Sequence, residues 1–258
     1  MPVELFETYC RSFLDGSEGD LAYRVKLDHS LRVRDEAARL AKIHAVELDR
    51  LGVSAETAAL AGLLHDAGRF EQFRRFQTFN DRVSVNHATL SVRVIRRENF
   101  LAHLSPAGQR LVLGAIMLHN RKIVRSPAST PLGYLARLLR DADKLDIYRV
   151  MLDYFTPGGD RHAFMTLDAK PHATAYTPEV LDDVLAGRMV DYARLCWEND
   201  FKLLMLAWVH DLNLPGTAKA FLERGFVGRV LSLLPDNPDV RKAGHILADT
   251  LARRAEET

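Results

Sequence analysis

Six side chains of the kinds that bind divalent metals are spread over the first part of the chain. Histidine nitrogen and aspartate oxygen are donors that transition metals prefer. Each of the six lies in or beside a segment whose pattern predicts a helix, and helices of a bundle can bring distant side chains together in its interior. We therefore expect one metal centre built from residues far apart in the sequence. Its candidate ligands are, in chain order, His29, the adjacent pair His65 and Asp66, His87, His119 and Asp143.

The pair His65-Asp66 directly follows the very apolar stretch 58–64. Ser54 is a suitable N-cap for a helix over that stretch, and a helix that is apolar nearly all round is a buried one. A buried charge is costly unless it is paired or bound to a metal. A metal is therefore the most economical explanation of the pair, and the alternative is a pair that only ends the helix and forms hydrogen bonds.

Two aspartates follow in a helix whose other face is rich in leucine. Asp143 and Asp146 are three residues apart, so they share one face of that helix. One of them can bind a metal while the other holds a ligand histidine in its orientation.

Helix signals dominate the whole chain. We predict a long amphipathic helix from about Ser30 to Leu51, with Asp28 or His29 at its start, and another over about 86–98. The stretch from Phe155 to Tyr176 is irregular, and long loops of this kind often form lids or binding loops. No strand pattern is long enough to count. Four further helices are expected to begin at a capping residue followed by proline, namely at Ser105-Pro106, Thr130-Pro131, Thr177-Pro178 and Asn237-Pro238.

Composition favours one helical domain. The 258 residues are 47% hydrophobic, which is enough for one sizeable core. We predict a single domain over 1–258, with a metal-binding core at about 25–150 and a C-terminal helical extension at about 178–258. A formal net charge of +1 gives no electrostatic reason to expect nucleic acid or membrane as a partner. Two distant cysteines and a start without signal-peptide features fit a cytoplasmic setting.

The ordered ligands and the sequences around them resemble the HD superfamily of metal-dependent phosphohydrolases. In that superfamily a histidine, a His-Asp pair and a distal aspartate bind a divalent metal. The matching segments are 63–69, which contains His65-Asp66, and 141–146, which contains Asp143. The resemblance covers roughly residues 25–150. It implies an all-α fold, an HD-domain helical bundle with a C-terminal helical extension.

The two histidines between the pair and the distal aspartate resemble the dinuclear branch of the superfamily. The resemblance implies one or two divalent transition metal ions, with Mn, Fe, Zn, Co and Ni as the alternatives. The doublet aspartate, Asp66, then bridges two metals. The first metal takes His29, His65, Asp66 and Asp143, and the second takes Asp66, His87 and His119.

The function implied by this resemblance is hydrolysis of a phosphoester through a metal-activated water. The expected partner is a nucleotide or another small phosphorylated metabolite, and Asp66 and Arg69 are the predicted catalytic residues. Arg69 stands where the dinuclear branch often has a lysine that contacts substrate phosphate, and a guanidinium can bind phosphate with two hydrogen bonds. The glutamate that serves mononuclear nucleotidases as general acid is missing, so no general acid is assigned.

Two other functions are open. Some dinuclear members of the superfamily hold two irons and oxidise their substrates with dioxygen, and their direct ligands are nearly the same. A non-catalytic, metal-stabilised binding module is the second alternative. A further His-Asp pair, His210-Asp211, lacks partners in the right order, and we interpret it as structural.

Overall fold

The computed structural model describes residues 2–156, 165–166 and 169–257. Within these residues every regular element is a helix, apart from one isolated β-bridge between Lys170 and Trp197. The predicted all-α fold is thus confirmed. Most of the predicted irregular segment falls on 157–168, of which only 165–166 belong to the described residues. The chain divides into two compact units, Met1–Asp146 and Ile147–Thr258, and the single domain over 1–258 stays a prediction.

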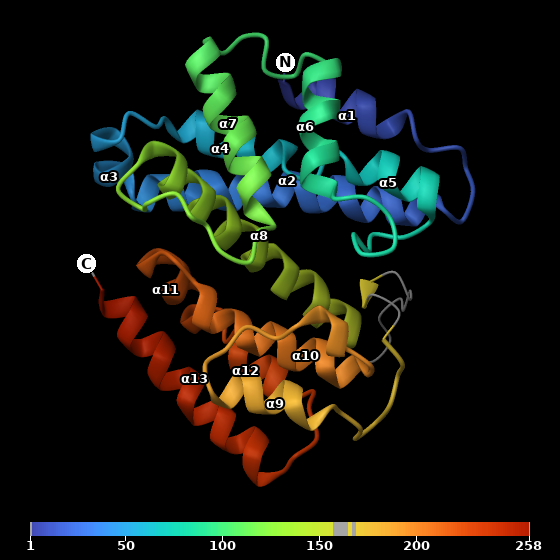
Figure 1. Ribbon diagram of the computed structural model, residues 1–258, viewed down its shortest axis with the longest axis vertical. Helices are drawn as coiled ribbons and strands as arrows, with labels where there is room; N and C mark the ends of the chain where they lie inside the picture. Colours follow the sequence, from blue (N-terminus) through green and yellow to red (C-terminus); the bar gives the residue numbers. More distant parts are fainter. Residues whose placement is uncertain (1, 157–164, 167–168, 258) are drawn as a thin grey trace. The chain divides into compact units, whose positions relative to one another are not determined.

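The N-terminal unit is a bundle in which the long helix α2 lies alongside several shorter helices (Figure 1). Its last helix, α8, continues into the residues of the second unit. The helices in chain order are α1 (Pro2–Arg11), α2 (Asp20–Ile43), α3 (Ala45–Arg50), α4 (Ala55–Leu64), α5 (Arg69–Phe76), α6 (His87–Arg97), α7 (Pro106–His119) and α8 (Pro131–Phe155).

Helix α4 is the buried helix that its apolar sequence predicts. Leu63 and Leu64 are fully buried. Gly62 lets α4 approach α2 closely, because a Cβ atom there would lie only 2.7 Å from the Val33 carbonyl oxygen. This close approach brings the end of α4, and with it His65, against the helix that carries His29.

A second glycine brings α6 close to the turn after α4. A Cβ atom at Gly68 would lie 2.5 Å from the Ser91 backbone nitrogen, and the Gly68 amide donates to Ser91 Oγ at 2.8 Å. Since His87 is the first residue of α6, this contact places His87 beside the turn that carries Asp66.

Several predicted helix starts are confirmed by their caps. The side chains of Ser54, Asn86, Ser105 and Asn237 each accept a hydrogen bond from a backbone amide of the helix that follows. Thr177 precedes α9 but does not cap it, because its hydroxyl donates to Asp200 Oδ2 at 2.8 Å instead.

The predicted bounds of the long amphipathic helix are wrong at both ends. Helix α2 begins at Asp20, so His29 lies well inside it rather than at its start. The buried stripe extends upstream to Ala22, and the Asp20 carboxylate accepts from the Asp15 and Gly16 amides ahead of the helix. The helical path breaks at His44, and α3 forms as a separate short helix.

The C-terminal unit packs around helix α10, every residue of which is buried. Tyr148 joins an aromatic cluster there, with ring centroids 4.6 Å from Phe221 and 5.3 Å from Phe226. The elements of this unit after α8 are α9 (Pro178–Leu185), η2 (Tyr192–Arg194), α10 (Glu198–Ala207), η3 (Trp208–Asp211), α11 (Pro215–Glu223), α12 (Phe226–Leu231) and α13 (Pro238–Glu256).

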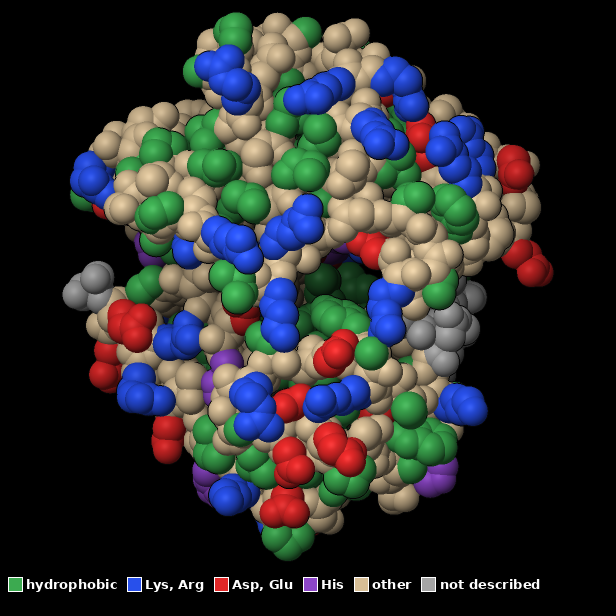
Figure 2. Space-filling model, in the orientation of Figure 1, with side chains coloured by type: hydrophobic (Ala, Val, Ile, Leu, Met, Phe, Trp, Pro, Cys, Tyr) green, Lys and Arg blue, Asp and Glu red, His purple; other side chains and the backbone are tan. Residues whose placement is uncertain are grey.

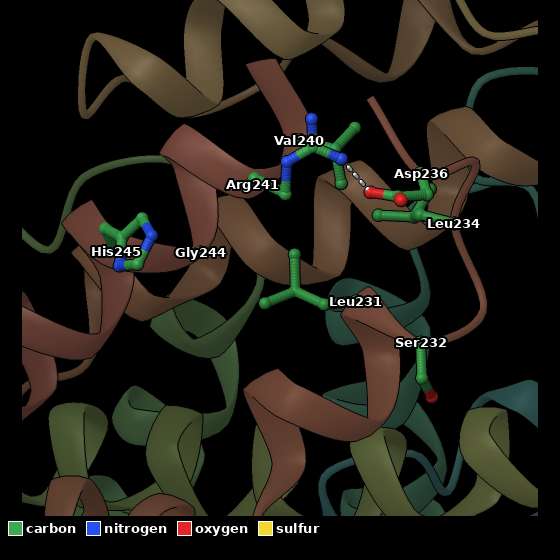
Figure 3. Close-up of a pocket in the computed structure, with 8 residues that line it drawn as sticks. All are labelled: Leu231, Ser232, Leu234, Asp236, Val240, Arg241, Gly244 and His245. Atoms are coloured by element: carbon green, nitrogen blue, oxygen red, sulfur yellow. Dashed lines mark hydrogen bonds and ion pairs between the residues drawn. The ribbon is translucent and has the colours of Figure 1, made fainter. Parts of the chain in front are cut away.

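A hollow of about 430 Å³ opens between α12 and α13 (Figure 3). Leu231 and Val240 supply apolar surface, and an ion pair between Arg241 and Asp236 lies at its edge. Helices α12 and α13 come close at Gly244, where a Cβ atom would lie 2.9 Å from Leu231 Cδ1.

Charged side chains do not gather in one patch on the face that Figure 2 draws. On the face drawn in Figure 2, lysine and arginine side chains are spread among apolar and acidic ones in both units. In the described part of the chain, no helix is both long enough and apolar enough to cross a membrane.

Candidate metal centre

The fold brings all six predicted ligands together in the N-terminal unit. His29 comes from the middle of α2, and His65 and Asp66 from the turn that follows α4. The others come from the first residue of α6, the last residue of α7, and α8. Potential ligand atoms in each of three overlapping groups lie within 4.8 Å of one another. The groups are His29, His65 and Asp66; His65, His119 and Asp143; and Asp66, His87 and His119.

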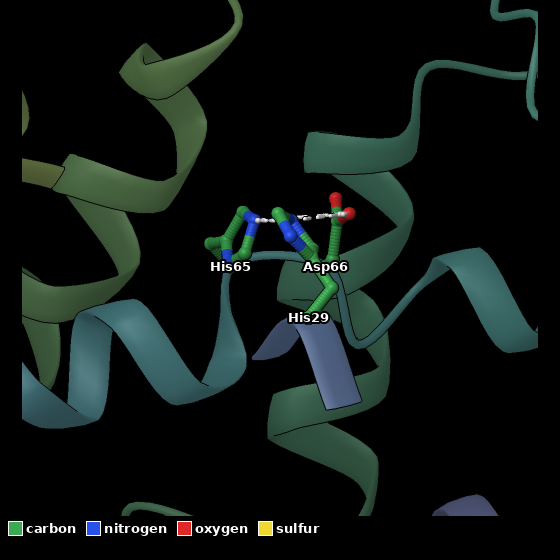
Figure 4. A group of neighbouring side chains, drawn as sticks. All are labelled: His29, His65 and Asp66. Atoms are coloured by element: carbon green, nitrogen blue, oxygen red, sulfur yellow. Dashed lines mark hydrogen bonds and ion pairs between the residues drawn. The ribbon is translucent and has the colours of Figure 1, made fainter. Parts of the chain in front are cut away.

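The first ligand group comprises His29, His65, Asp66 and Asp143. Figure 4 shows the side chains of His29, His65 and Asp66 pointing toward one another from α2 and from the turn after α4. The Nε2 atoms of His29 and His65 are 3.3 Å apart. Asp143 Oδ1 lies 3.2 Å from His29 Nε2 and 3.5 Å from His65 Nε2. Two nitrogens and a carboxylate oxygen thus face one small volume.

The second ligand group comprises Asp66, His87 and His119. The Nε2 atoms of the two histidines are 3.0 Å apart, and His87 Nε2 lies 3.6 Å from Asp66 Oδ1. The rings of His65 and His119 are also in edge contact, with centroids 5.2 Å apart. The two ligand groups are therefore neighbours.

Asp66 is shared by the two groups, one oxygen to each. Its Oδ2 lies 3.7 Å from the Nε2 atoms of both His29 and His65. Its Oδ1 faces His87 instead, at the 3.6 Å given above. This is the arrangement expected of a carboxylate that bridges two cations.

Each of the four histidines is held through its other ring nitrogen. His65 Nδ1 donates to the Gly62 carbonyl at 2.8 Å, and His119 Nδ1 donates to the Ile116 carbonyl at 2.6 Å. A carbonyl oxygen can only accept, so these two rings carry their proton on Nδ1 and present an unprotonated Nε2 in the neutral form. Histidine ligands are commonly oriented by such a partner on the far nitrogen.

Carboxylates hold the other two histidine rings. Asp146 Oδ2 accepts from His29 Nδ1 at 2.7 Å, and Asp81 Oδ2 accepts from His87 Nδ1 at 2.6 Å. Arg32 keeps Asp146 in place, with its Nε 2.5 Å from Asp146 Oδ1. Asp146 therefore has the orienting position that its spacing from Asp143 suggests.

Positive neighbours keep the buried carboxylates charged. Burial by itself would raise the pKa of Asp66, but the positive charge of Lys26, together with the neighbouring His65 and Arg69, lowers that pKa well below its usual value. Burial likewise opposes a charge on Asp143, and His29 and His65 outweigh it, so the pKa of Asp143 is also well below its usual value. Both aspartates are thus available as anionic ligands.

The histidines of the second group are held neutral. Burial, together with the neighbouring His87, lowers the pKa of His119 to about 3. Burial and then Arg69 lower the pKa of His87. In the first group burial also opposes a charge on His29, but the neighbouring carboxylates of Asp143 and Asp146 outweigh burial and raise the pKa of His29.

Comparison with protein families gives the same assignment as the geometry. The family model described as HD domain matches residues 27–148, the stretch that contains all six residues. These residues form an HD domain. No curated protein and no solved structure matches the chain.

The residues of this HD domain fit divalent transition metals. His87 and His119 present two unprotonated nitrogens 3.0 Å apart, and such a pair repels unless a cation shares the lone pairs. In addition, Asp143 Oδ1 is buried and accepts no hydrogen bond from any described residue. Imidazole nitrogen and carboxylate oxygen together are typical donors for Zn, Fe, Mn, Co and Ni.

Arg69, the predicted phosphate clamp, is anchored within the HD domain. Its Nη1 donates to the Phe79 carbonyl at 2.6 Å, to Gln72 Oε1 at 2.8 Å and to Asp81 Oδ1 at 3.0 Å. Its Nε lies 3.3 Å from Asp66 Oδ1. The guanidinium therefore adds positive charge beside the second ligand group, and its contact with substrate phosphate stays a prediction.

Three charged residues of the centre were missed by sequence reasoning. Lys26 lies three residues before His29, so helical spacing would have placed it on the same face if the helix had been extended upstream. Arg32 lies three residues after His29, inside the predicted helix, where the same spacing already relates the two residues. Asp81 lies between α5 and α6, where no periodicity relates it to His87. Lys26 Nζ donates to Asp66 Oδ2 at 2.7 Å.

The second His-Asp pair has different partners. His210 Nε2 donates to the Val184 carbonyl at 3.2 Å, and neither His210 nor Asp211 belongs to a metal-type grouping among the described residues. His162, which also has no place in the predicted order of ligands, lies outside the residues that the structure describes.

Proposed function

We propose that this HD protein is a metal-dependent phosphohydrolase that cleaves a phosphoester of a nucleotide or another small phosphorylated metabolite. The observation that carries the proposal is the shared position of Asp66. Its Oδ2 faces His29 and His65 while its Oδ1 faces His87, which supports a site for two cations side by side. Two-metal sites of this kind suit phosphoester cleavage, since two cations can neutralise both the attacking and the leaving oxygen.

The first ligand group would hold one metal and the second ligand group the other, with Asp66 common to both. When bound, the metals would supply Lewis acidity, which activates water near neutral pH and offsets negative charge on a phosphoryl oxygen.

The remaining residues orient and charge the site. Asp146 and Asp81 fix the rings of His29 and His87, so that the Nε2 atom of each ring points into its own ligand group. Arg69 places a permanent positive charge next to Asp66, which favours an anionic substrate. The mixed charges of the surface support a small phosphorylated partner over a nucleic acid.

The proposal is tested by metal analysis and a panel of phosphoesters. We expect purified protein to bind up to two divalent ions per chain, and to release phosphate from at least one nucleotide or small phosphoester. Chelation should abolish the release, and Asp143→Asn should reduce it by more than about 100-fold, since even indirect supports of a metal are worth about 10–100-fold. Bound metal without phosphate release from any member of the panel would contradict the proposal.

Two outcomes would assign another function. Visible absorption that depends on iron, with oxygen uptake and no phosphate release, would identify a dinuclear-iron oxygenase. Metal binding that stabilises the fold without any turnover would identify a metal-binding module.

A further inference from the structure

Lys26 is a cation beside the ligand groups, and among the described residues its ammonium group has one hydrogen-bond partner. It lies one helical turn before His29 on α2, and its Nζ is 2.7 Å from Asp66 Oδ2. Its side chain is 18% exposed, whereas the His65 side chain is fully buried. Solvent therefore reaches the cluster on the side where Lys26 lies.

The two cations beside Asp66 are held very differently. Arg69 is fixed through Nη1 by three acceptors, as described above, so moving it would break several hydrogen bonds at once. Within the part of the chain that the structure describes, the ammonium group of Lys26 contacts Asp66 Oδ2 and the face of the Phe79 ring, whose centroid is 5.2 Å away. Lysine also has a flexible stem, so Lys26 is the cation that can change partners.

The oxygen bound by Lys26 is also the one offered to the first ligand group. Asp66 Oδ2 lies 3.7 Å from His29 Nε2 and from His65 Nε2. A metal in the first ligand group would compete with Lys26 Nζ for the lone pairs of Asp66 Oδ2. A metal that takes this oxygen leaves the ammonium group of Lys26 next to the site and in need of an anion.

We propose that Lys26 binds an anionic oxygen of the substrate's phosphoryl group once Asp66 is committed to metal. This inference rests on the proposed phosphohydrolase function and adds to it the residue that contacts the substrate. Arg69, held by its three acceptors, then adds positive charge near the substrate without moving. Lys26 changes its hydrogen-bond partner from Asp66 to the phosphate.

Amine labelling of the unaltered protein tests the proposal without turnover. Metal-loaded protein is treated with acetic anhydride with and without inorganic phosphate, and each lysine is followed by mass spectrometry. Phosphate at about ten times its dissociation constant should slow acetylation of Lys26 about tenfold, because occupancy protects in proportion to ligand excess. Lys42, exposed near the end of the same helix, is the internal control and should react at an unchanged rate. An unchanged rate at Lys26 overturns the proposal.

Three variants provide the second test. Lys26→Met removes the charge and keeps much of the length, Lys26→Arg keeps the charge, and Lys42→Met is the matched control. In metal-loaded protein, we expect Lys26→Met to weaken binding of inorganic phosphate about tenfold or more, the typical value of a hydrogen bond to a charged group. Lys26→Arg should stay within about threefold of wild type, because it keeps the charge. Metal content should be equal in all four proteins.

The outcomes separate this inference from the function on which it rests. Equal phosphate affinity in Lys26→Met and wild type, an equal loss in Lys42→Met, or loss of metal from Lys26→Met would each overturn the role of Lys26. If wild type hydrolyses no phosphoester while phosphate still protects Lys26, the proposed function fails and the anion contact stands. If wild type hydrolyses phosphoesters and Lys26 is not protected, the function stands and the inference fails.

Discussion

The chain contains two His-Asp pairs, and they stand in similar local sequence. His65-Asp66 follows the buried helix α4, and His210-Asp211 ends η3, directly after the buried helix α10. Each pair therefore lies at the end of an apolar helix inside its own unit.

Their surroundings differ in every respect that matters for metal binding. His65 Nδ1 is occupied by a carbonyl, and its Nε2 faces two further ligands, His29 and Asp143. His210 uses its Nε2 on a carbonyl, and its own carbonyl oxygen accepts from Arg254 Nη2 at 2.7 Å. The comparison teaches that the dipeptide is a weak signal. The meaningful signal is the set of partners from other helices.

The sharpest test of this difference is loss of the aspartate from each pair. Asp66→Ala removes the ligand shared by both groups, so we expect activity to fall by more than ~1,000-fold, well beyond the ~10–100-fold of an indirect support. Asp211→Ala should keep wild-type activity and metal content. Metal analysis and turnover on the same preparations check both. Equal losses in the two variants would mean that the pairs do not differ in function.

The two-metal arrangement is tested by removing a histidine from the second ligand group. His119→Ala should lower bound metal from two ions to one per chain, since the first ligand group is left intact. His103→Ala, an exposed histidine just before α7, is the matched control and should keep both ions. A single ion already present in wild type would restrict the site to one metal.

The orienting carboxylates should have smaller effects than the ligands. In Asp146→Asn the side-chain oxygen can still accept a hydrogen bond from His29 Nδ1, but the negative charge is lost. We therefore expect metal affinity to fall about 10–100-fold. Asp153→Asn, exposed on the same helix α8, should leave the affinity unchanged. Competition with a chelator of known affinity measures the metal affinity of both variants. Unchanged affinity in Asp146→Asn would mean that backbone packing alone orients His29.

The smallest effect is expected at His210. His210→Ala removes one hydrogen bond, so the free energy of unfolding should fall by about 1 kcal/mol at pH 7, with metal content unchanged. Both tryptophans lie in residues 147–258, so their fluorescence in urea reports on the C-terminal unit.

The contribution of His210 should also depend on pH. Burial, with a smaller effect of Arg254, lowers the pKa of His210. In the unfolded chain the pKa of histidine is about 6.5, so below that pH the unfolded chain binds more protons than the folded chain. The stability that His210 contributes is therefore lost as the pH falls. The difference in the free energy of unfolding between wild type and His210→Ala should therefore decrease as the pH falls from 7 to 5. A difference that increases toward pH 5 would contradict the lowered pKa.

Much of the fold follows from local sequence signals. Capping residues and prolines mark the starts of α7, α8 and α13, and the apolar run of α4 identifies a buried helix. These signals depend on neighbours in the chain, which is why they can be interpreted without coordinates. The start of α2 was misplaced because Asp28, a good capping residue, lies inside a helix whose buried stripe continues upstream.

The centre itself is predictable only in part. The order of the six residues identified them, but Lys26 and Asp81 were missed for different physical reasons. Lys26 needed the correct start of α2 to be seen on the face of His29. Asp81 reaches His87 from a loop, and the path of a loop is set by tertiary contacts such as those of Arg69 and Gln72.

The pairing of His29 with Asp146 has a consequence for biosynthesis. The two residues are 117 positions apart, so α8 must leave the ribosome before the first ligand group can close. At about 5–20 residues per second, synthesis of that interval takes roughly 10 s. During this time the first ligand group lacks Asp143 and Asp146, so its closure belongs to the period after α8 has emerged, whereas every residue of the second ligand group precedes α8.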